Sequence, residues 1–225
     1  MILSDGLKKQ CAKEALKYIK NNTVVGLGGG STIAHIIDFI KEHKLNIRVV
    51  TPSVKTRSLC AEKGIEVIDT SLINKVDIAF DGCDEVDNNL NALKSCGGIH
   101  TKEKIIASMA DEYILLADET KVSKSLNFKF PVVLEVIPEA LSYVCKMAEK
   151  TGGRVEVRTS SAKDGYTISD NGNILIDVFY QNVDDIKELE KSLISIRGVI
   201  DTSLFVDVVT KAIVVSENGV REIKG

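Results

Sequence analysis

The chain has 225 residues, 44% of them hydrophobic, and its formal net charge at pH 7 is −3. A chain of this length and composition can bury one large core, or a core with a smaller attached unit. Lysine and arginine are spread along the sequence, so the charge pattern favours neither nucleic acid nor an anionic membrane as a partner. We therefore expect a small-molecule ligand.

The cysteine content and the apolar runs indicate a cellular compartment. Five cysteines, an odd number without a CxxC pair, are typical of neither a disulfide framework nor a zinc site. The first residues lack the long apolar core of a signal peptide, and no apolar run approaches the roughly 20 residues that span a bilayer. These features predict a cytoplasmic protein with reduced thiols.

The first half of the chain predicts alternating helices and short buried strands. An amphipathic helix is expected from Ser4 to Lys20, where apolar residues recur every four positions. A second helix should begin near Ser31 or Thr32, since both are good N-cap residues. The remaining predicted elements are strands at 24–27, 47–50, 65–68, 77–80 and 113–118 and helices at 53–63 and after Glu103. This order predicts a doubly wound, mainly parallel α/β sheet.

Past Lys121 the sequence predicts a smaller α+β unit. A strand at 132–137 leads through Pro138, a favoured first helical residue, into a helix that stops at Gly152. Alternating apolar and polar residues on either side of an Asn-Gly turn at 171–172 predict an antiparallel hairpin.

The last predicted elements complete the domain organisation. A helix is expected at 183–196, and the C-terminal strands are expected to return to the first sheet. We therefore expect residues 1–129 plus 203–225 to form the larger α/β domain and residues 130–202 to form an α+β insert.

A glycine-rich loop, GLGGGST from Gly26 to Thr32, follows the first predicted strand. Its bare backbone can approach an anion at a helix N-terminus, where free N–H groups and the helix dipole favour phosphate. The loop matches neither GxGxxG nor the GK[ST] of a nucleotide-binding P-loop, so a small sugar phosphate suits it better than a nucleotide. The alternative is a tight strand-to-helix turn that binds no ligand.

Carboxylates gather behind the predicted strand at 77–80, in the sequence DGCDEVD. Asp81 and Asp84 follow the strand end, where open α/β sheets bind ligands. Glu103 on the next helix is expected to face the same crevice. Because repulsion and partial burial raise the pKa of clustered carboxyl groups, one of them is suited to act as a general base at neutral pH.

Positive charge is predicted at the same place. Lys94, just before the turn Ser-Cys-Gly-Gly, offers an ammonium group for a phosphate or a developing oxyanion. For the acids the alternatives are a solvated loop or a magnesium site. Glu85 and Asp87 are expected to be solvated. No paired His and Cys spacing predicts a transition-metal site, although His100 lies close to Glu103.

The motifs GLGGGST, DGCDEVD, TKEKIIASMA, LADETK and SDNGNILIDV, with the turn from Lys94 to Gly98, resemble ribose-5-phosphate isomerase of type A in order and spacing over nearly the whole chain. The resemblance implies a Rossmann-like catalytic domain with a ferredoxin-like α+β insert. It implies interconversion of ribose 5-phosphate and ribulose 5-phosphate in the non-oxidative pentose phosphate pathway, without metal or organic cofactor. It also implies a homodimer or homotetramer, with the insert as the interface.

The resemblance implies roles for individual residues. Glu103 matches the base that moves a proton between carbons 2 and 1 through a cis-enediolate, and Asp81 matches a residue that assists opening of the furanose ring. Asp84 and Lys94 match residues that bind the sugar hydroxyls and stabilise the oxyanion. The residues expected to bind the substrate, chiefly its phosphate, are Lys8, Gly29, Gly30, Ser31, Thr32, Gly82, Cys83, Ser95, Cys96, Gly97 and Lys121. As single charges, Lys8 and Lys121 are otherwise typical of solvated surface.

The chain departs from the family pattern at a few positions. Gly29 replaces a threonine of the usual loop, Ser95 and Cys96 stand in a turn that is usually all glycine, and His100 replaces an apolar residue. These changes spare every expected catalytic side chain.

The rival functions are a sugar-phosphate sensor of a transcription regulator and another enzyme of similar architecture, such as a sugar-phosphate deaminase or a CoA transferase. A regulator would carry a basic helix-turn-helix. Because the first predicted helix leads directly into the sheet, we expect no such segment.

Overall fold

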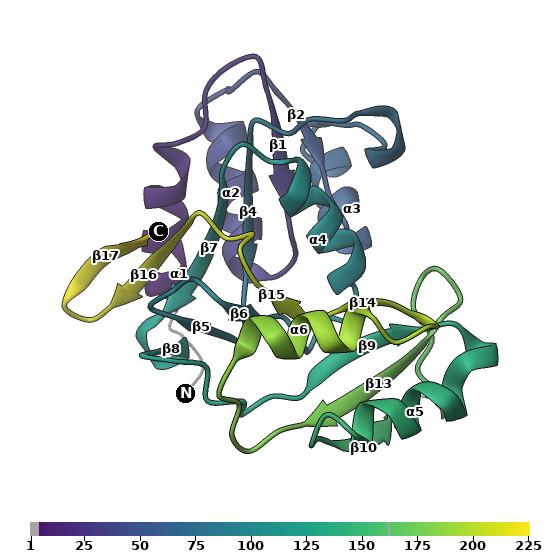
Figure 1. Ribbon diagram of the computed structural model, residues 1–225. Helices are drawn as coiled ribbons and strands as arrows, with labels where there is room; N and C mark the ends of the chain where they lie inside the picture. Colours follow the sequence, from purple (N-terminus) through teal and green to yellow (C-terminus); the bar gives the residue numbers. More distant parts are fainter. Residues whose placement is uncertain (1–4, 162) are drawn as a thin grey trace.

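The computed structural model describes residues 5–161 and 163–225. Its largest element is a seven-stranded sheet (Figure 1). The strands are β1 (Thr23–Leu27), β2 (Ile47–Val50), β3 (Glu66–Val67), β4 (Ile78–Gly82), β7 (Tyr113–Asp118), β16 (Lys211–Ser216) and β17 (Gly219–Lys224). Their order is β17-β16-β7-β4-β1-β2-β3, and all neighbours are parallel except β16 and β17. The predicted mainly parallel sheet is confirmed.

Helices cover both faces of this sheet. On one face, α1 (Asp5–Leu16), α2 (Ser31–Glu42) and α3 (Val54–Glu62) share a core with the sheet. On the other face lies α4 (His100–Met109), which packs through Ile106 and Ala107. The isoleucines of α2 show why the sequence folds in this way: Ile33, Ile36, Ile37 and Ile40 recur at helical spacing and are fully buried. The sheet is doubly wound, as predicted.

The topology creates a crevice between β1 and β4. From β1 the chain runs outward to β2 and β3, and then it crosses back to form β4 on the other side of β1. The connections that leave these two neighbouring strands therefore diverge, which is where open α/β sheets bind ligands. The glycine loop follows β1 and Asp81 lies near the end of β4, so both border this crevice. Gly28 N donates to Phe80 O at 2.9 Å and joins the two strand ends.

A second sheet belongs to the smaller part of the fold. Its strands are β9 (Val132–Val136), β10 (Arg154–Val157), β13 (Ile174–Phe179) and β14 (Val199–Thr202), in the order β10-β13-β9-β14 with all pairs antiparallel. Helices α5 (Leu141–Glu149) and α6 (Ile186–Ile194) pack on it. This β-α-β-β-α-β order is ferredoxin-like, as the resemblance implied. We call these elements the α+β unit.

A third, four-stranded sheet lies between the large sheet and the α+β unit (Figure 1). It is formed by β15 (Leu204–Phe205), β6 (Ala92–Leu93), β5 (Glu85–Asp87) and β8 (Val122–Ser123). It was not predicted, because strands of two or three residues are too short to show a period. Of the C-terminal strands expected to return to the large sheet, β16 does so, whereas β15 pairs with β6 of this third sheet.

Several predicted helix boundaries were wrong. Helix α1 ends at Leu16 and not at Lys20, because the following N–H groups bond three residues back, as in a tight turn. The expected start at Ser4 lies outside the described residues. Helix α2 begins at Ser31, as predicted, but its N-cap is Gly30 at φ 99° and not Ser31 or Thr32. Helix α6 is shorter than predicted, because the carboxylate of Asp185 caps it.

The predicted hairpin is more complex than a simple pair. Strands β10 and β13 do pair, but a ribbon of β11 (Thr159–Ser160) and β12 (Lys163–Tyr166) is inserted between them. The Asn-Gly turn is present: Ser169 N donates to Asn173 O at 2.7 Å, and Gly172 adopts φ 85°. Of the helices in the described ranges, none is both long and apolar enough to cross a membrane.

Candidate active site

Three buried charged side chains meet at the end of β4. Asp81 comes from β4, Lys94 follows β6, and Glu103 lies in the first turn of α4. The ammonium Nζ of Lys94 is 3.0 Å from Asp81 Oδ2 and 3.3 Å from Glu103 Oε1. It also donates to Gly82 O at 2.5 Å. The three side chains are only 5–8% exposed, so they interact at low dielectric. The structure thus brings together three of the four side chains expected to be catalytic.

The surroundings of Glu103 shift its protonation into the neutral range. Burial, followed by the charge of Asp81, raises the pKa of Glu103 to about 8, against the opposing effect of Lys94. Burial alone would lower the pKa of Lys94, but Asp81 and Glu103 together raise it above its ordinary value. Lys94 therefore remains an ammonium group, and Glu103 can gain and lose a proton near neutral pH, as a general base requires.

Tyr113, which was not predicted, and Gly28 of the glycine loop also lie against Asp81. The hydroxyl of Tyr113 donates to Asp81 Oδ2 at 3.4 Å, and burial raises the pKa of Tyr113 well above its ordinary value, so it remains a donor. A Cβ at Gly28 would lie 1.9 Å from Asp81 Oδ1. The absence of a side chain at Gly28 therefore makes room for Asp81. A single tyrosine outside any motif could not be predicted to lie in the site, whereas Gly28 belongs to the glycine-rich loop that the sequence showed.

The fourth expected catalytic residue, Asp84, contacts the turn that follows Lys94. Its Oδ2 accepts hydrogen bonds from the N–H groups of Ser95 (2.6 Å) and Cys96 (3.0 Å). The hydroxyl of Ser95 in turn donates to Pro131 O at 2.5 Å. Asp84 thus holds the turn after Lys94. Cys96 and Gly97 of that turn are exposed.

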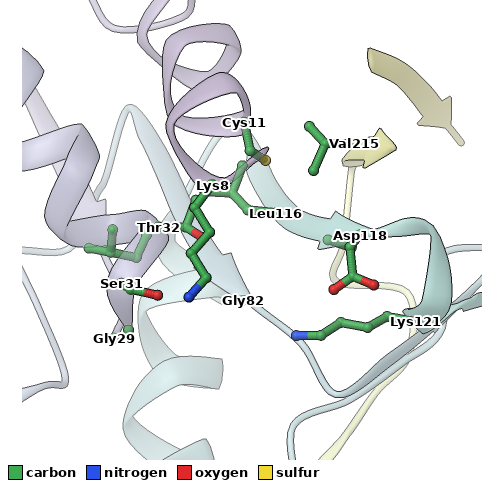
Figure 2. Close-up of a pocket in the computed structure, with 13 residues that line it drawn as sticks. Lys8, Cys11, Gly29, Ser31, Thr32, Gly82, Leu116, Asp118, Lys121 and Val215 are labelled. Carbon is green, nitrogen blue, oxygen red and sulfur yellow. The ribbon is translucent and has the colours of Figure 1, made fainter. Parts of the chain in front are cut away.

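A cavity of about 320 Å³ adjoins the cluster (Figure 2). Figure 2 shows Lys8 and Lys121 reaching toward it from opposite sides. Of the residues expected to bind substrate, those that line it are Lys8, Gly29, Gly30, Ser31, Thr32, Gly82 and Lys121. The other lining residues are Cys11, Ile33, Leu116, Ala117, Asp118 and Val215. Two lysines and the N-terminus of α2 give this cavity the electrostatic character of an anion site.

The cavity and the buried cluster meet at Gly82. Gly82 lines the cavity, and its carbonyl accepts the hydrogen bond from Lys94. The next carbonyl, of Cys83, accepts from Lys121 Nζ at 2.7 Å. The end of β4 is therefore held by one lysine of the cluster and one of the cavity, which fixes the two regions side by side.

The prediction that Glu85 and Asp87 are solvated was wrong. Both side chains are buried, at 3% and 0% exposure. Glu85 accepts from the N–H groups of Asn127 and Phe130, and Asp87 accepts from the N–H and side-chain amide groups of Asn91. Asp87 satisfies backbone donors of the turn between β5 and β6, and Glu85 satisfies those of the segment 127–130.

His100 is fully buried, and burial lowers its pKa to about 4, so it is packed as a neutral ring. Within 5–161 and 163–225, no group of three His, Cys, Asp or Glu side chains is placed to hold a metal ion. Asp81 and Glu103 instead share the ammonium group of Lys94.

Fold and site together define an α/β enzyme with an acid–base cluster beside a cavity for a small anionic ligand. Comparison with known proteins gives the family. Residues 48–219 match the family model described as ribose 5-phosphate isomerase A (phosphoriboisomerase A). The chain is 40% identical to the ribose-5-phosphate isomerase A of Methanocaldococcus jannaschii, over 98% of this chain and 99% of that protein. It is also 40% identical to that of Pyrococcus abyssi, over 97% of each. The chain belongs to the ribose 5-phosphate isomerase A family.

A solved structure supports the same assignment. A D-ribose-5-phosphate isomerase in complex with phospho-erythronic acid superposes with a TM-score of 0.94 at 37% identity, covering 100% of both chains. A second family model, the DeoR C terminal sensor domain, matches residues 5–72 only. That segment holds the glycine loop but none of Asp81, Lys94 and Glu103. The resemblance stated from the sequence is confirmed.

Proposed function

We propose that this protein interconverts ribose 5-phosphate and ribulose 5-phosphate, as an aldose–ketose isomerase of the non-oxidative pentose phosphate pathway. The proposal rests on the environment of Glu103 in a chain of this family. Its carboxyl group is buried, has a pKa raised to about 8, and contacts the ammonium group of Lys94. An isomerase of this kind needs one base that is both a good acceptor and a good donor of a proton.

The proposed reaction moves one proton between two carbons and one between two oxygens, and it needs no external oxidant or reductant. The Glu103 carboxylate removes the proton from C2 of the open-chain aldose, and the C–H electron pair forms the C1–C2 double bond. The carbonyl π pair moves onto O1, which gives a cis-enediolate. The protonated Glu103 then returns a proton to C1, the C1–C2 π pair forms the new C1–H bond, and a lone pair of O2 forms the C2=O bond. The hydroxyl proton of O2 passes to O1, so that the ketone at C2 and the hydroxyl at C1 are complete. Lys94, 3.3 Å from Glu103, supplies the positive charge that stabilises the enediolate oxygens.

Asp81 and Asp84 take the remaining catalytic roles. Asp81 contacts Lys94 and Tyr113, and it assists proton transfer in the opening of the furanose ring. Asp84 orders the turn after Lys94 through the N–H groups of Ser95 and Cys96, and we assign the exposed residues of that turn, Cys96 and Gly97, to the sugar hydroxyls.

The cavity would bind the phosphate end of the substrate. The loop from Gly29 to Thr32 supplies backbone N–H groups, and Lys8 and Lys121 supply charge. Binding energy at this remote group positions the reacting carbons beside Glu103.

The domain organisation and assembly form part of the proposal. Residues 1–129 plus 203–225 would form the catalytic domain and residues 130–202 the insert. A hydrophobic core centred on the α+β unit, which also takes in Leu93 and Leu204 of the third sheet, supports this division. Exposed apolar side chains on this unit, Ile137, Tyr143, Ile194 and Ile200, favour it as the interface of a homodimer or homotetramer. The free cysteines suit a cytoplasmic location.

The test is formation of ribulose 5-phosphate from ribose 5-phosphate by the purified, EDTA-treated protein. We expect rapid isomerisation to an equilibrium mixture, with no requirement for added metal. Folded protein that binds ribose 5-phosphate without converting it would contradict the proposal and would favour a sugar-phosphate sensor. Conversion of a different phosphosugar alone would favour another enzyme of this architecture.

A further inference from the structure

We propose that the α+β unit positions the catalytic base: Glu135 and Asp201 hold the first turn of α4 so that Glu103 is presented to Lys94. This inference rests on the proposed function. It concerns positioning residues, since neither Glu135 nor Asp201 lines the cavity.

Helix α4 lacks a side-chain cap of its own. Its N-cap residue is Ile99, which makes no side-chain hydrogen bond to the helix. The first turn of a helix has free N–H groups and the positive end of the dipole, and an uncapped turn frays easily. Glu103 lies in this turn. Its placement therefore depends on contacts from outside the helix.

The first such contact joins Thr101 to the α+β unit. The hydroxyl of Thr101 donates to Glu135 Oε2, on the buried strand β9. The other carboxylate oxygen of Glu135 accepts from Ser169 Oγ (2.7 Å), Asn171 Nδ2 (3.3 Å) and Asn173 Nδ2 (2.7 Å).

These bonds make Glu135 a fixed acceptor. Burial alone would raise the pKa of Glu135, but its four hydrogen bonds, the first from Thr101, hold that pKa below the ordinary value. A buried carboxylate that remains ionised also interacts favourably with the positive end of α4. Holding Thr101 and the first turn of α4 explains why the charged side chain of Glu135 is kept inside the α+β unit, where it is only 2% exposed.

The second contact joins Lys104 to β14. Its Nζ is 2.7 Å from Asp201 Oδ1 and donates to Thr202 O at 2.8 Å. Glu190 of α6 lies 3.5 Å away, and the ammonium lies 5.2 Å from the centroid of the Phe205 ring. The Lys104 side chain is only 12% exposed, so this is a partly buried ion pair.

The two contacts bracket the base. Thr101 and Lys104 are three residues apart and share one side of the helix, whereas Glu103 points to Lys94 on the large-sheet side. Contacts on one side thus fix the rotation of the turn and with it the carboxyl group on the other. A shift of about 1 Å in a catalytic group can cost about 100-fold in rate.

The experiment compares Thr101→Val with Thr101→Ser and Asp201→Asn in the full-length protein. Valine keeps the shape of threonine and removes the donor, whereas serine keeps the donor. We expect Thr101→Val and Asp201→Asn to lower kcat about 10- to 100-fold with KM changed less than about threefold. Thr101→Ser should keep kcat within about threefold of the parent protein.

The matched control is Asp170→Asn. It breaks the ion pair with Lys102, which also links α4 to the α+β unit, but both side chains of that pair are more than a third exposed. We expect unchanged kcat and KM, because exposed pairs contribute little. An equal fall in kcat for Asp170→Asn, or an unchanged kcat in Thr101→Val, would overturn the proposal.

A measurement without turnover separates this proposal from the proposed function. Carbon-13 carboxyl NMR, with Glu103→Gln to assign the signal, follows the titration of Glu103 among its neighbours Asp81, Lys94 and Tyr113. In Thr101→Val the pKa of Glu103 should move from about 8 toward its ordinary value, as the carboxyl group leaves the buried cluster. An unchanged titration in a folded variant would overturn the positioning role even if the parent protein isomerised a different sugar.

Discussion

At the scale of single residues, the site depends on an imbalance of charge. Asp81 and Glu103 are two acids that share one ammonium group, so full ionisation leaves an excess negative charge in a buried place. Burial, followed by this excess of negative charge, raises the pKa of Glu103, because both are relieved when the carboxyl group holds a proton. A base that readily holds a proton can also deliver it to the next carbon.

The pH dependence of the reaction should report this group. We predict that kcat/KM for ribose 5-phosphate rises with pH and levels off above an apparent pKa near 8, because only ionised Glu103 can remove the C2 proton. Initial rates between pH 6 and 10 test this. A profile that is flat over that range would contradict the assigned base.

The same pKa shift predicts an effect on stability. The pKa of Glu103 is raised in the folded state from the ordinary 4.5 to about 8, so the folded form binds more protons than the unfolded form between these values. Stability is therefore lost as pH rises through this window, and the loss is complete above pH 8.

Glu103→Gln removes that loss and keeps the shape of the side chain. We predict that its gain in unfolding free energy over the parent protein grows from pH 5 to pH 9, where it reaches about 1 kcal/mol or more and appears as a higher melting temperature. Thermal unfolding of both proteins at several pH values is the measurement. A difference that does not vary with pH would show that the buried charge costs nothing.

At the scale of elements, the glycine loop is shaped by its contact with β4. We predict that Gly28→Ala abolishes activity, because the new methyl group would overlap Asp81, whereas Gly29→Ala retains most of it. At Gly29 the nearest atom to a new Cβ is Ser53 Oγ, at 3.6 Å. Equal activities of the two variants would contradict the close approach of loop and strand.

Helix α1 contributes the charge of Lys8 to the cavity. The neighbouring Lys9 offers a control substitution on the same helix. We predict that Lys8→Met raises KM about 10-fold or more, and weakens inhibition by inorganic phosphate to a similar degree, with a smaller effect on kcat. Lys9→Met should change neither, because Lys9 pairs with Asp5 on the exposed surface. A fall in kcat alone for Lys8→Met would place Lys8 at the reacting carbons instead.

Long periodic elements were predictable, whereas short ones were not. The strand β2 and the helix α3 were correctly placed, since their apolar runs and the Ser53 cap are visible in the sequence. The sheet containing β5 depends on pairing between segments distant in the chain. Without it, Glu85 looked like a surface acid, because its partners are backbone groups some 40 residues away.

At the scale of the whole molecule, the crevice is assembled from both ends of the chain. Lys8 and Val215 line the same cavity, which follows from the return of β16 to the large sheet beside β7. The strand-end rule was enough to predict that Asp81 and Glu103 approach each other. It could not predict Tyr113, which reaches Asp81 from the start of a neighbouring strand.

The α+β unit also supports the site beyond α4. Arg158 donates to Ser95 O at 3.0 Å and pairs with Asp177. The α+β unit therefore also holds the turn whose N–H groups bond to Asp84. The sequence predicted the unit, but its contacts with the site depend on the docking of two separately built cores.

In the proposed reaction, Glu103 moves the proton between C2 and C1. The most direct test is NMR of the reaction in D₂O, with the parent protein and with Glu103→Gln at matched concentration. We predict that the parent protein places deuterium at C1 of ribulose 5-phosphate, and that Glu103→Gln binds ribose 5-phosphate but incorporates none. Deuterium incorporation by Glu103→Gln at a rate similar to that of the parent protein would contradict the account.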